Sequence, residues 1–133
     1  MRLTRIAQLI SLLFLMLSAC GGVDEGSDGG SVTTTPGEVV AGDPVNGAVV
    51  YAGSCASCHA RDLSGVDGLG MPLAPNAFVE SNSEEDLIAF LVVGRRADDP
   101  LNNQGIDMQP RGGNPSLTDQ DLADVSAYLK AHQ

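Results

Sequence analysis

The stretch "YAGSCASCHARD", residues 51–62, holds two cysteines separated by two residues and a histidine directly after the second cysteine. Proteins use thiol groups widely for redox chemistry and metal binding, and imidazole groups widely as metal ligands. Cys55, Cys58 and His59 are therefore the strongest chemical signal in the chain, and the fold built around them depends on which chemistry they perform.

Two of the chemistries open to such a trio agree poorly with the rest of the sequence. A redox dithiol of the thioredoxin type belongs in a β-α-β context, and no convincing alternating run of strand length is present. A zinc site needs four ligands. The trio offers three at most, and the adjacent Cys58 and His59 are awkward to bring onto one ion. His132, the only other histidine, is expected at the end of the last helix, where a solvated histidine is favourable.

The third chemistry is covalent attachment of a haem, for which C-x-x-C-H is the sequence signature. In such a site each thiol adds to one vinyl group of the porphyrin, and the histidine that follows lies beneath the iron. We therefore predict one haem c, bound covalently by Cys55 and Cys58, with His59 as an axial ligand of the iron.

Residues 43–133 are predicted to form an all-α domain of three main helices joined by long loops. Each helix has a start signal in the sequence: Asp43 with Pro44 for the first, Ser83 for the second and Thr118 for the third. Gly94 is expected to end the second helix. Apolar residues recur at helical spacing in all three segments: Val45, Ala48, Val49 and Ala52 in the first, Leu87, Ile88 and Leu91 in the second, and Leu122, Val125 and Leu129 in the third.

The second loop, residues 95–115, shows no evident secondary structure, which is unusual inside a compact domain unless the loop is functional. It contains Met108, which is separated from His59 by enough chain to reach the opposite side of a haem. Methionine is a frequent second ligand of haem iron. We predict Met108 as that ligand and expect its bond to the iron to be one of few contacts that order the loop. Met71, much closer to His59 along the chain, is the alternative.

Residues 1–20 have the parts of an export signal in the required order. A basic opening, "MRLTR", precedes an uncharged, largely apolar run, "IAQLISLLFLML", which is too short to span a bilayer comfortably. "LSAC", residues 17–20, resembles the bacterial lipoprotein box, which implies that Cys20 is acylated and becomes the first mature residue. We predict a signal peptide at 1–19 and a lipidated N-terminus with a flexible acidic linker at 20–42. The protein is thus expected to be anchored to a bacterial membrane on its periplasmic or extracytoplasmic side, with an ordinary cleaved signal or a short anchor as the alternative.

The composition argues against nucleic acid as a partner and favours a cofactor buried in the interior. With 17 acidic and 7 basic residues the formal charge is −10, which argues against nucleic acid as a partner. Two tyrosines, three phenylalanines and no tryptophan leave few large side chains for a core. A buried cofactor would relieve that shortage, and a small aliphatic core is the alternative.

Residues 43–133 resemble a class I c-type cytochrome of the small bacterial monohaem kind. The resemblance rests on "GAVVYAGSCASCHARD", "GMPL" and "DMQPRGGNPSLTDQDLADVSAYL" and on their order along the chain. It implies the class I cytochrome c fold around one covalently bound haem, with Gly47 and Tyr51 of the first helix crossing Tyr128 of the last. It also implies that the carbonyl of Pro72 accepts a hydrogen bond from His59.

The charged residues depart from the family pattern in one respect. Mitochondrial members carry a ring of lysines around the exposed haem edge, whereas this chain has a single lysine, Lys130. The partner is therefore expected to be basic itself or to be held nearby by the membrane. Arg95, Arg96 and Arg111 are candidates to pair with the haem propionates, with solvated surface charges as the alternative.

Coordination by both His59 and Met108 would leave no open position on the iron. We therefore predict an electron-transfer protein rather than an enzyme, with redox proteins as partners, no small-molecule substrate, and a membrane tether that raises its concentration near those partners. A fixed cytochrome subunit of a larger dehydrogenase or terminal oxidase is the first alternative. A haem enzyme or gas-binding domain is the second, and it requires that Met108 be displaceable.

Overall fold

The computed structural model describes residues 41–133. The predicted signal peptide, the predicted lipidation site Cys20 and nearly all of the predicted linker lie outside the described residues. Within the described part of the chain, no helix is long and apolar enough to cross a membrane.

The described residues form helices joined by loops, as the sequence predicts. The elements in chain order are α2 (Pro44–Ser54), α3 (Ala56–His59), α4 (Ala77–Ser81), α5 (Glu84–Val93), η1 (Pro110–Gly113) and α6 (Asp119–Lys130). Between residues 41 and 133, β-structure is limited to two isolated bridges, Val66–Gly70 and Arg95–Met108. The prediction of an all-α fold is confirmed. The three predicted helices are α2, α5 and α6, while the short α3, α4 and η1 were not anticipated.

The three main helices begin at the predicted residues because a side chain there satisfies the free N–H groups of the first turn. The carboxylate of Asp43 accepts a hydrogen bond from the N–H of Val45. Ser83 and Thr118 each form a capping box with the aspartate three residues later. Helix α5 ends at Gly94, whose φ of 74° suits glycine.

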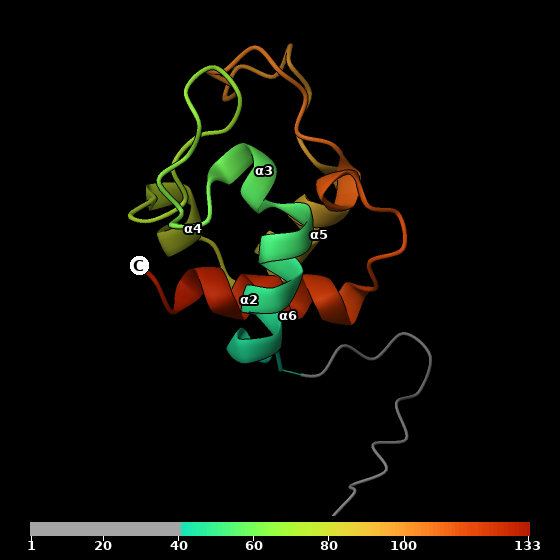
Figure 1. The fold of residues 1–133 in the computed structure, drawn as a ribbon. Coiled ribbons are helices and arrows are strands. Elements are labelled where there is room, and N and C mark those ends of the chain that lie inside the picture. The colour runs from blue at the N-terminus through green and yellow to red at the C-terminus, as the bar shows by residue number, and fades with distance from the viewer. Residues whose placement is uncertain (1–40) are drawn as a thin grey trace, which may run out of the picture. The chain divides into compact units, whose positions relative to one another are not determined.

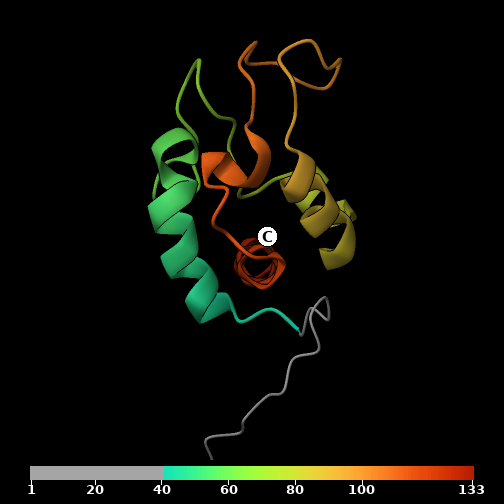
Figure 2. The same ribbon diagram turned by 90° about the vertical axis from the view of Figure 1, so that its right-hand side faces the viewer.

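Helix α6 is the centre of the packing. It lies across one end of the domain, with the loops at the opposite end (Figure 1). In the view along its axis, α2 and α5 lie on its two sides (Figure 2). Gly47 allows α2 to approach closely, because a Cβ atom there would lie 2.0 Å from the carbonyl oxygen of Asp124. One turn further, the rings of Tyr51 and Tyr128 have centroids 5.3 Å apart. The crossing implied by the family resemblance is therefore present.

The buried core is small and mostly aliphatic. Its buried members are Tyr51, Leu63, Val79, Leu87, Leu91, Leu122, Val125 and Leu129. The stripe predicted on the second helix contributes Leu87 and Leu91 to this core. The stripe predicted on the third helix contributes all of its members, Leu122, Val125 and Leu129. All of these core side chains except Leu63 and Leu122 line the site described below.

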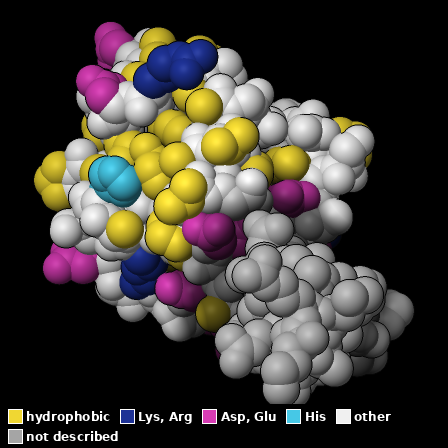
Figure 3. Space-filling view, turned by 60° about the horizontal axis from the view of Figure 1, so that its bottom comes forward, with side chains coloured by type: hydrophobic (Ala, Val, Ile, Leu, Met, Phe, Trp, Pro, Cys, Tyr) yellow, Lys and Arg dark blue, Asp and Glu magenta, His cyan; other side chains and the backbone are white. Residues whose placement is uncertain are grey.

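The helix predicted from the apolar residues of the first segment is present, but the stripe that they form does not face the core. Val45 and Val49 are 76% and 69% exposed, whereas the buried residues of α2 are Gly47 and Tyr51. The close approach to α6 requires glycine, so the face that contains Gly47 turns inward and the valines turn outward. Hydrophobic side chains on the surface of the domain are seen as yellow groups in Figure 3.

Candidate functional site

A cavity of about 320 Å³ is lined by the helices and by the two loops at residues 60–76 and 94–109, a size typical of ligand and cofactor sites. Its lining is predominantly apolar and includes side chains from α5 and α6, among them Leu87, Phe90, Leu91, Val125 and Leu129. Cys55, Cys58, His59 and Met108 also line it. The structure thus brings together in one cavity all four residues predicted to bind the haem, from segments far apart in the sequence. Met71 lines the same cavity.

The two cysteines are held by the junction of α2 and α3. The N–H of Cys55 donates to the carbonyl of Tyr51 at 2.9 Å and ends α2. The carbonyl of Cys55 then accepts from the N–H groups of Cys58 and His59 at 3.1 and 3.0 Å. Burial, and secondarily the neighbouring Cys58, raises the pKa of the Cys55 thiol to about 11. Reactive redox dithiols have a lowered thiol pKa, so this environment argues against the dithiol alternative.

The imidazole of His59 is oriented by a backbone carbonyl. Its Nδ1 lies 2.8 Å from the carbonyl oxygen of Met71. A carbonyl oxygen only accepts, so Nδ1 carries the proton and Nε2 keeps its lone pair. The ring nitrogen left to bind a metal is therefore Nε2. The hydroxyl of Tyr51 supports the turn after His59 by donating to the carbonyl of Ala60 at 2.6 Å.

The predicted role of Pro72 is wrong by one residue. Its carbonyl accepts a hydrogen bond from Nδ2 of Asn76 at 2.6 Å, and the partner of His59 is the carbonyl of Met71. The reason is the close packing of Gly70 on the cysteine motif, where a Cβ atom would lie 2.2 Å from the carbonyl oxygen of Cys58. This contact brings the next residue, Met71, beside the histidine ring.

Met108 is fixed through its backbone to the end of α5. Its N–H donates to the carbonyl of Arg95 at 2.7 Å, and its carbonyl accepts from the N–H of Arg95 at 2.9 Å. Gly94 makes the pairing possible, because a Cβ atom there would lie 2.2 Å from the carbonyl oxygen of Met108. The half-buried side chain of Met108 packs against the core.

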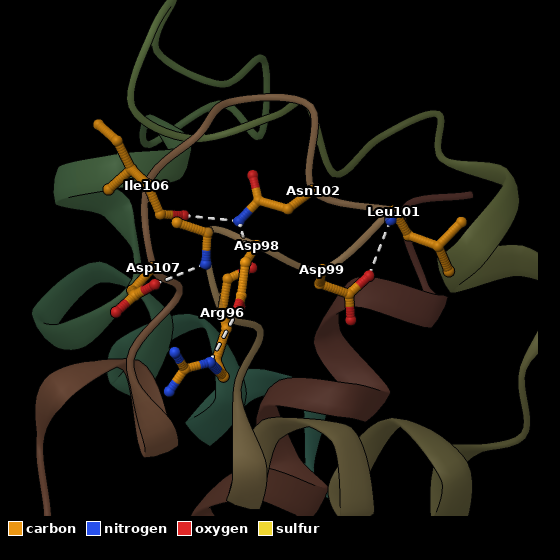
Figure 4. Close-up of polar contacts among 8 residues, drawn as sticks. Arg96, Asp98, Asp99, Leu101, Asn102, Ile106 and Asp107 are labelled. Carbon is orange, nitrogen blue, oxygen red and sulfur yellow. Dashed lines mark hydrogen bonds and ion pairs between the residues drawn. The ribbon is translucent and has the colours of Figure 1, made fainter.

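The loop that precedes Met108 is ordered by its own hydrogen bonds, contrary to the expectation that few contacts would order it. Asn102 joins its two limbs, donating through Nδ2 to the carbonyls of Arg96 and Ile106 at 2.9 and 2.7 Å (Figure 4). The carboxylate of Asp107 accepts from the N–H of Ala97 at 2.5 Å. Met108 therefore follows a preformed loop.

The three candidate arginines have different surroundings. Arg111 donates to the carbonyl of Leu117 at 2.8 Å and forms an ion pair with Asp119 at 2.6 Å. Arg96 pairs with Asp98 on the surface, where the two side chains are 81% and 74% exposed. Of the three, only Arg95 lines the cavity. The described geometry therefore favours a surface role for Arg96, a structural role for Arg111 and a position at the site for Arg95.

The guanidinium of Arg95 is held by aromatic rings. It stacks over Phe78 and Phe90, with its carbon 5.0 and 4.8 Å from the two ring centroids, a favourable cation–π arrangement. The two rings themselves meet edge to face, 4.9 Å apart. The sequence showed the arginine, but nothing in its local pattern indicated these two rings.

Comparison with known proteins agrees with this geometry. The cytochrome c family model matches residues 44–133. The chain belongs to the cytochrome c family. Cytochrome c-555 of Prosthecochloris aestuarii is 32% identical over 95 residues, which are 71% of this chain and 93% of that protein. The cytochrome c subunit of a quinone-dependent alcohol dehydrogenase from Gluconobacter oxydans (strain 621H) is 32% identical over 84 residues, 63% of this chain but 17% of the subunit. No solved structure matches.

Membership of the cytochrome c family implies a covalently attached haem c, and Cys55 and Cys58 fit its C-x-x-C-H motif. The cavity fits such a group in three respects. It is lined mainly by apolar side chains, both thiols lie in its wall, and the imidazole that lines it has only Nε2 left for a metal.

Proposed function

We propose that this cytochrome c carries single electrons between redox proteins outside the cytoplasm while tethered to a membrane by a lipid on Cys20. The observation that carries the proposal is the single cavity that contains Cys55, Cys58, His59 and Met108. A haem c held there supplies a centre that exchanges one electron without bond rearrangement in a substrate. A role in electron transfer agrees with both relatives named above.

Two axial ligands are proposed, His59 through Nε2 and Met108 through its sulfur. Support for the first comes from the hydrogen bond that occupies Nδ1. Support for the second comes from the backbone pairing with Arg95, which holds Met108 at the cavity. With both ligands bound, no position remains for a small-molecule substrate, so we propose electron transfer and no enzymatic reaction.

The ligation is tested by an optical spectrum recorded during redox titration of the purified holoprotein. We expect a low-spin spectrum in both oxidation states, a weak charge-transfer band at the red end in the ferric state, and a single one-electron transition. Carbon monoxide should leave the reduced spectrum unchanged. Rapid carbon monoxide binding by the parent protein would instead favour a haem enzyme or gas-binding domain.

The membrane tether is proposed from the sequence of residues 1–20 alone. Acyl chains contribute about 0.8 kcal/mol for each buried methylene, so more than one chain gives a stable anchor. Cys20→Ala removes the acceptor thiol, and we expect the haem domain to leave the membrane fraction. A variant that fractionates with membranes like the parent would show that the anchor is something other than a lipid on Cys20.

A second candidate is a fixed electron-transfer subunit of a larger dehydrogenase or terminal oxidase. The relative from Gluconobacter oxydans favours it, since that protein is a cytochrome c subunit of a dehydrogenase. Purification in mild detergent separates the two candidates. A free carrier elutes at the size of one chain in its micelle, whereas a fixed subunit elutes with stoichiometric partner chains.

A further inference from the structure

The carbonyl that orients His59 belongs to a peptide unit that can form hydrogen bonds through that carbonyl alone. Residue 72 is a proline, so the Met71–Pro72 peptide has no N–H and can form hydrogen bonds only through its carbonyl oxygen. That oxygen lies 2.8 Å from Nδ1 of His59. The plane of the peptide must therefore be fixed by the residues on its two sides.

On the side that precedes Met71, the chain is fixed by a small backbone bridge. The N–H of Val66 donates to the carbonyl of Gly70 at 2.8 Å, and the N–H of Gly70 donates to the carbonyl of Val66 at 2.9 Å. Gly65 packs against the same segment, since a Cβ atom there would lie 2.7 Å from the carbonyl carbon of Met71. This side involves backbone atoms alone.

On the other side, the Pro72–Leu73 peptide is held at both of its polar groups: the N–H of Leu73 donates to the carbonyl of Leu63 at 2.8 Å, and the carbonyl of Pro72 is held by the side chain of Asn76. Its Nδ2 donates to the carbonyl of Pro72 at 2.6 Å, while its Oδ1 accepts from the N–H groups of Phe78 and Val79 at 3.0 and 3.2 Å at the start of α4. Asn76 therefore joins the peptide after Pro72 to a helix, and it also lines the cavity. Because the ring of Pro72 fixes φ, an anchored Pro72 carbonyl leaves little freedom for the Met71 carbonyl.

Gln133 braces the same segment from the residues that follow α6. Its Oε1 accepts from the N–H of Asn76 at 2.9 Å, and its Nε2 donates to the carbonyls of Leu73 and Leu129 at 3.0 and 2.7 Å. The brace ties the position of Asn76 to α6, the helix on which the domain is packed.

We propose that Asn76, braced by Gln133, is a positioning residue for His59. Its side-chain amide fixes the Pro72 carbonyl and, through the rigid proline, the Met71 carbonyl that accepts the hydrogen bond from Nδ1. This inference rests on the proposed role of His59 as an iron ligand. A well-oriented bond from Nδ1 raises the basicity of the ligand, which favours the ferric state and lowers the reduction potential.

The test compares two substitutions at the two ends of the same short helix in the holoprotein. Asn76→Ser keeps a good helix cap but removes the amide that reaches Pro72. Asn82→Ser is the matched control, because Nδ2 of Asn82 donates to the carbonyl of Phe78 at 2.7 Å, within α4 and away from the Met71–Pro72 peptide. The measurements are the reduction potential and, by NMR, the exchange rate of the Nδ1 proton of His59.

We expect Asn76→Ser to raise the potential and to speed exchange of the Nδ1 proton roughly fivefold, the effect of losing one modest hydrogen bond. Asn82→Ser should leave both at parental values. The positioning role is contradicted if Asn76→Ser leaves both unchanged, or if Asn82→Ser moves them equally. Should Asn76→Ser give no folded holoprotein, Gln133→Ala decides by the same measurements, since it keeps Asn76 and its cap and removes only the brace.

Failure of this inference can be told apart from failure of the proposed function. A parent protein whose spectrum lacks histidine ligation contradicts the proposed function. A parent with histidine ligation, combined with a normal potential and Nδ1 exchange in Asn76→Ser and Gln133→Ala, contradicts only the role of Asn76.

Discussion

At the scale of single residues, the two methionines that line the cavity make different backbone contacts. Met71 gives its carbonyl to Nδ1 of His59, so its backbone belongs to the wall that carries the histidine. Met108 is paired with Arg95 at the end of α5, on a separate segment of the chain. Met108 thus reaches the cavity from a segment that does not carry the histidine, which agrees with its proposed role as the second iron ligand.

Met108→Ala is therefore expected to erase the ferric charge-transfer band, lower the reduction potential and open the iron to carbon monoxide or cyanide. The loop of residues 96–107 should stay ordered, because Asn102 and Asp107 hold it independently. Optical titration and ligand binding measure the first effects, and amide exchange measures the order of the loop. Met71→Ala is the control and should keep the band, at a stability cost below about 2 kcal/mol for a half-buried side chain. The opposite result for the two variants would reverse the assignment.

At the scale of elements, the junction of α2 and α6 determines which face of α2 is buried. The motif spacing was enough to single out Cys55, Cys58 and His59, because those residues are neighbours on one turn, and the structure places all three at the cavity. It was not enough to orient α2, because Gly47 has no side chain and adds nothing to an apolar stripe, while Val45 and Val49 form a stripe that faces solvent. Backbone contacts such as the one made by the carbonyl of Met71 likewise leave no local sequence signal.

Gly47→Ala tests the junction. The added Cβ would lie 2.0 Å from the carbonyl oxygen of Asp124, so the two helices must separate, and we expect a loss of about 2–3 kcal/mol in the free energy of unfolding. Gly53→Ala, on the same helix, meets nothing within 4 Å and should be neutral or stabilising by about 0.5–1 kcal/mol. Urea unfolding of both holoproteins measures the difference. Equal stabilities would mean that the close approach contributes nothing.

Asp124 makes the same junction sensitive to pH. Burial alone would raise the pKa of this carboxyl, but its hydrogen bonds outweigh burial and hold the pKa below its ordinary value. The donors are the N–H of Asp43 at 2.9 Å, Nδ2 of Asn46 at 2.6 Å and Nε2 of Gln120 at 2.9 Å. Because the folded-state pKa is the lower one, the stabilisation is complete above the unfolded-state value near 4 and is lost as pH falls through the folded-state pKa.

Asp124→Asn is expected to lower the free energy of unfolding at pH 7 by about 1–3 kcal/mol and to flatten its decline below about pH 4. Urea titrations at a series of pH values give both quantities. Asp98→Asn removes a carboxylate whose side chain is 74% exposed, and it should change the neutral-pH stability little. An acid limb of unchanged slope in Asp124→Asn would show that other carboxylates dominate acid unfolding.

At the scale of the whole molecule, the covalent cofactor has a structural role as well as a chemical one. The core holds few large side chains, and the cavity that its members line has a volume of about 320 Å³. At about 24 cal/mol for each Å³ of empty space, such a cavity would cost up to about 8 kcal/mol. That is comparable with the whole stability of a small domain, about 5–15 kcal/mol. Covalent attachment through Cys55 and Cys58 therefore secures the largest single contributor to the interior.

The double substitution Cys55→Ala, Cys58→Ala should leave no covalent haem and little cooperatively folded protein. The helices α2, α5 and α6 would keep their caps, so some helical signal in circular dichroism is expected, but without a sharp thermal transition or fixed side-chain NMR signals. A single Ser57→Ala substitution, between the two cysteines at an exposed position, is the control and should load haem and melt like the parent. A compact apo form of the double variant with a sharp thermal transition would contradict this prediction. It would mean that the aliphatic core alone specifies the fold and that folding does not require the cofactor.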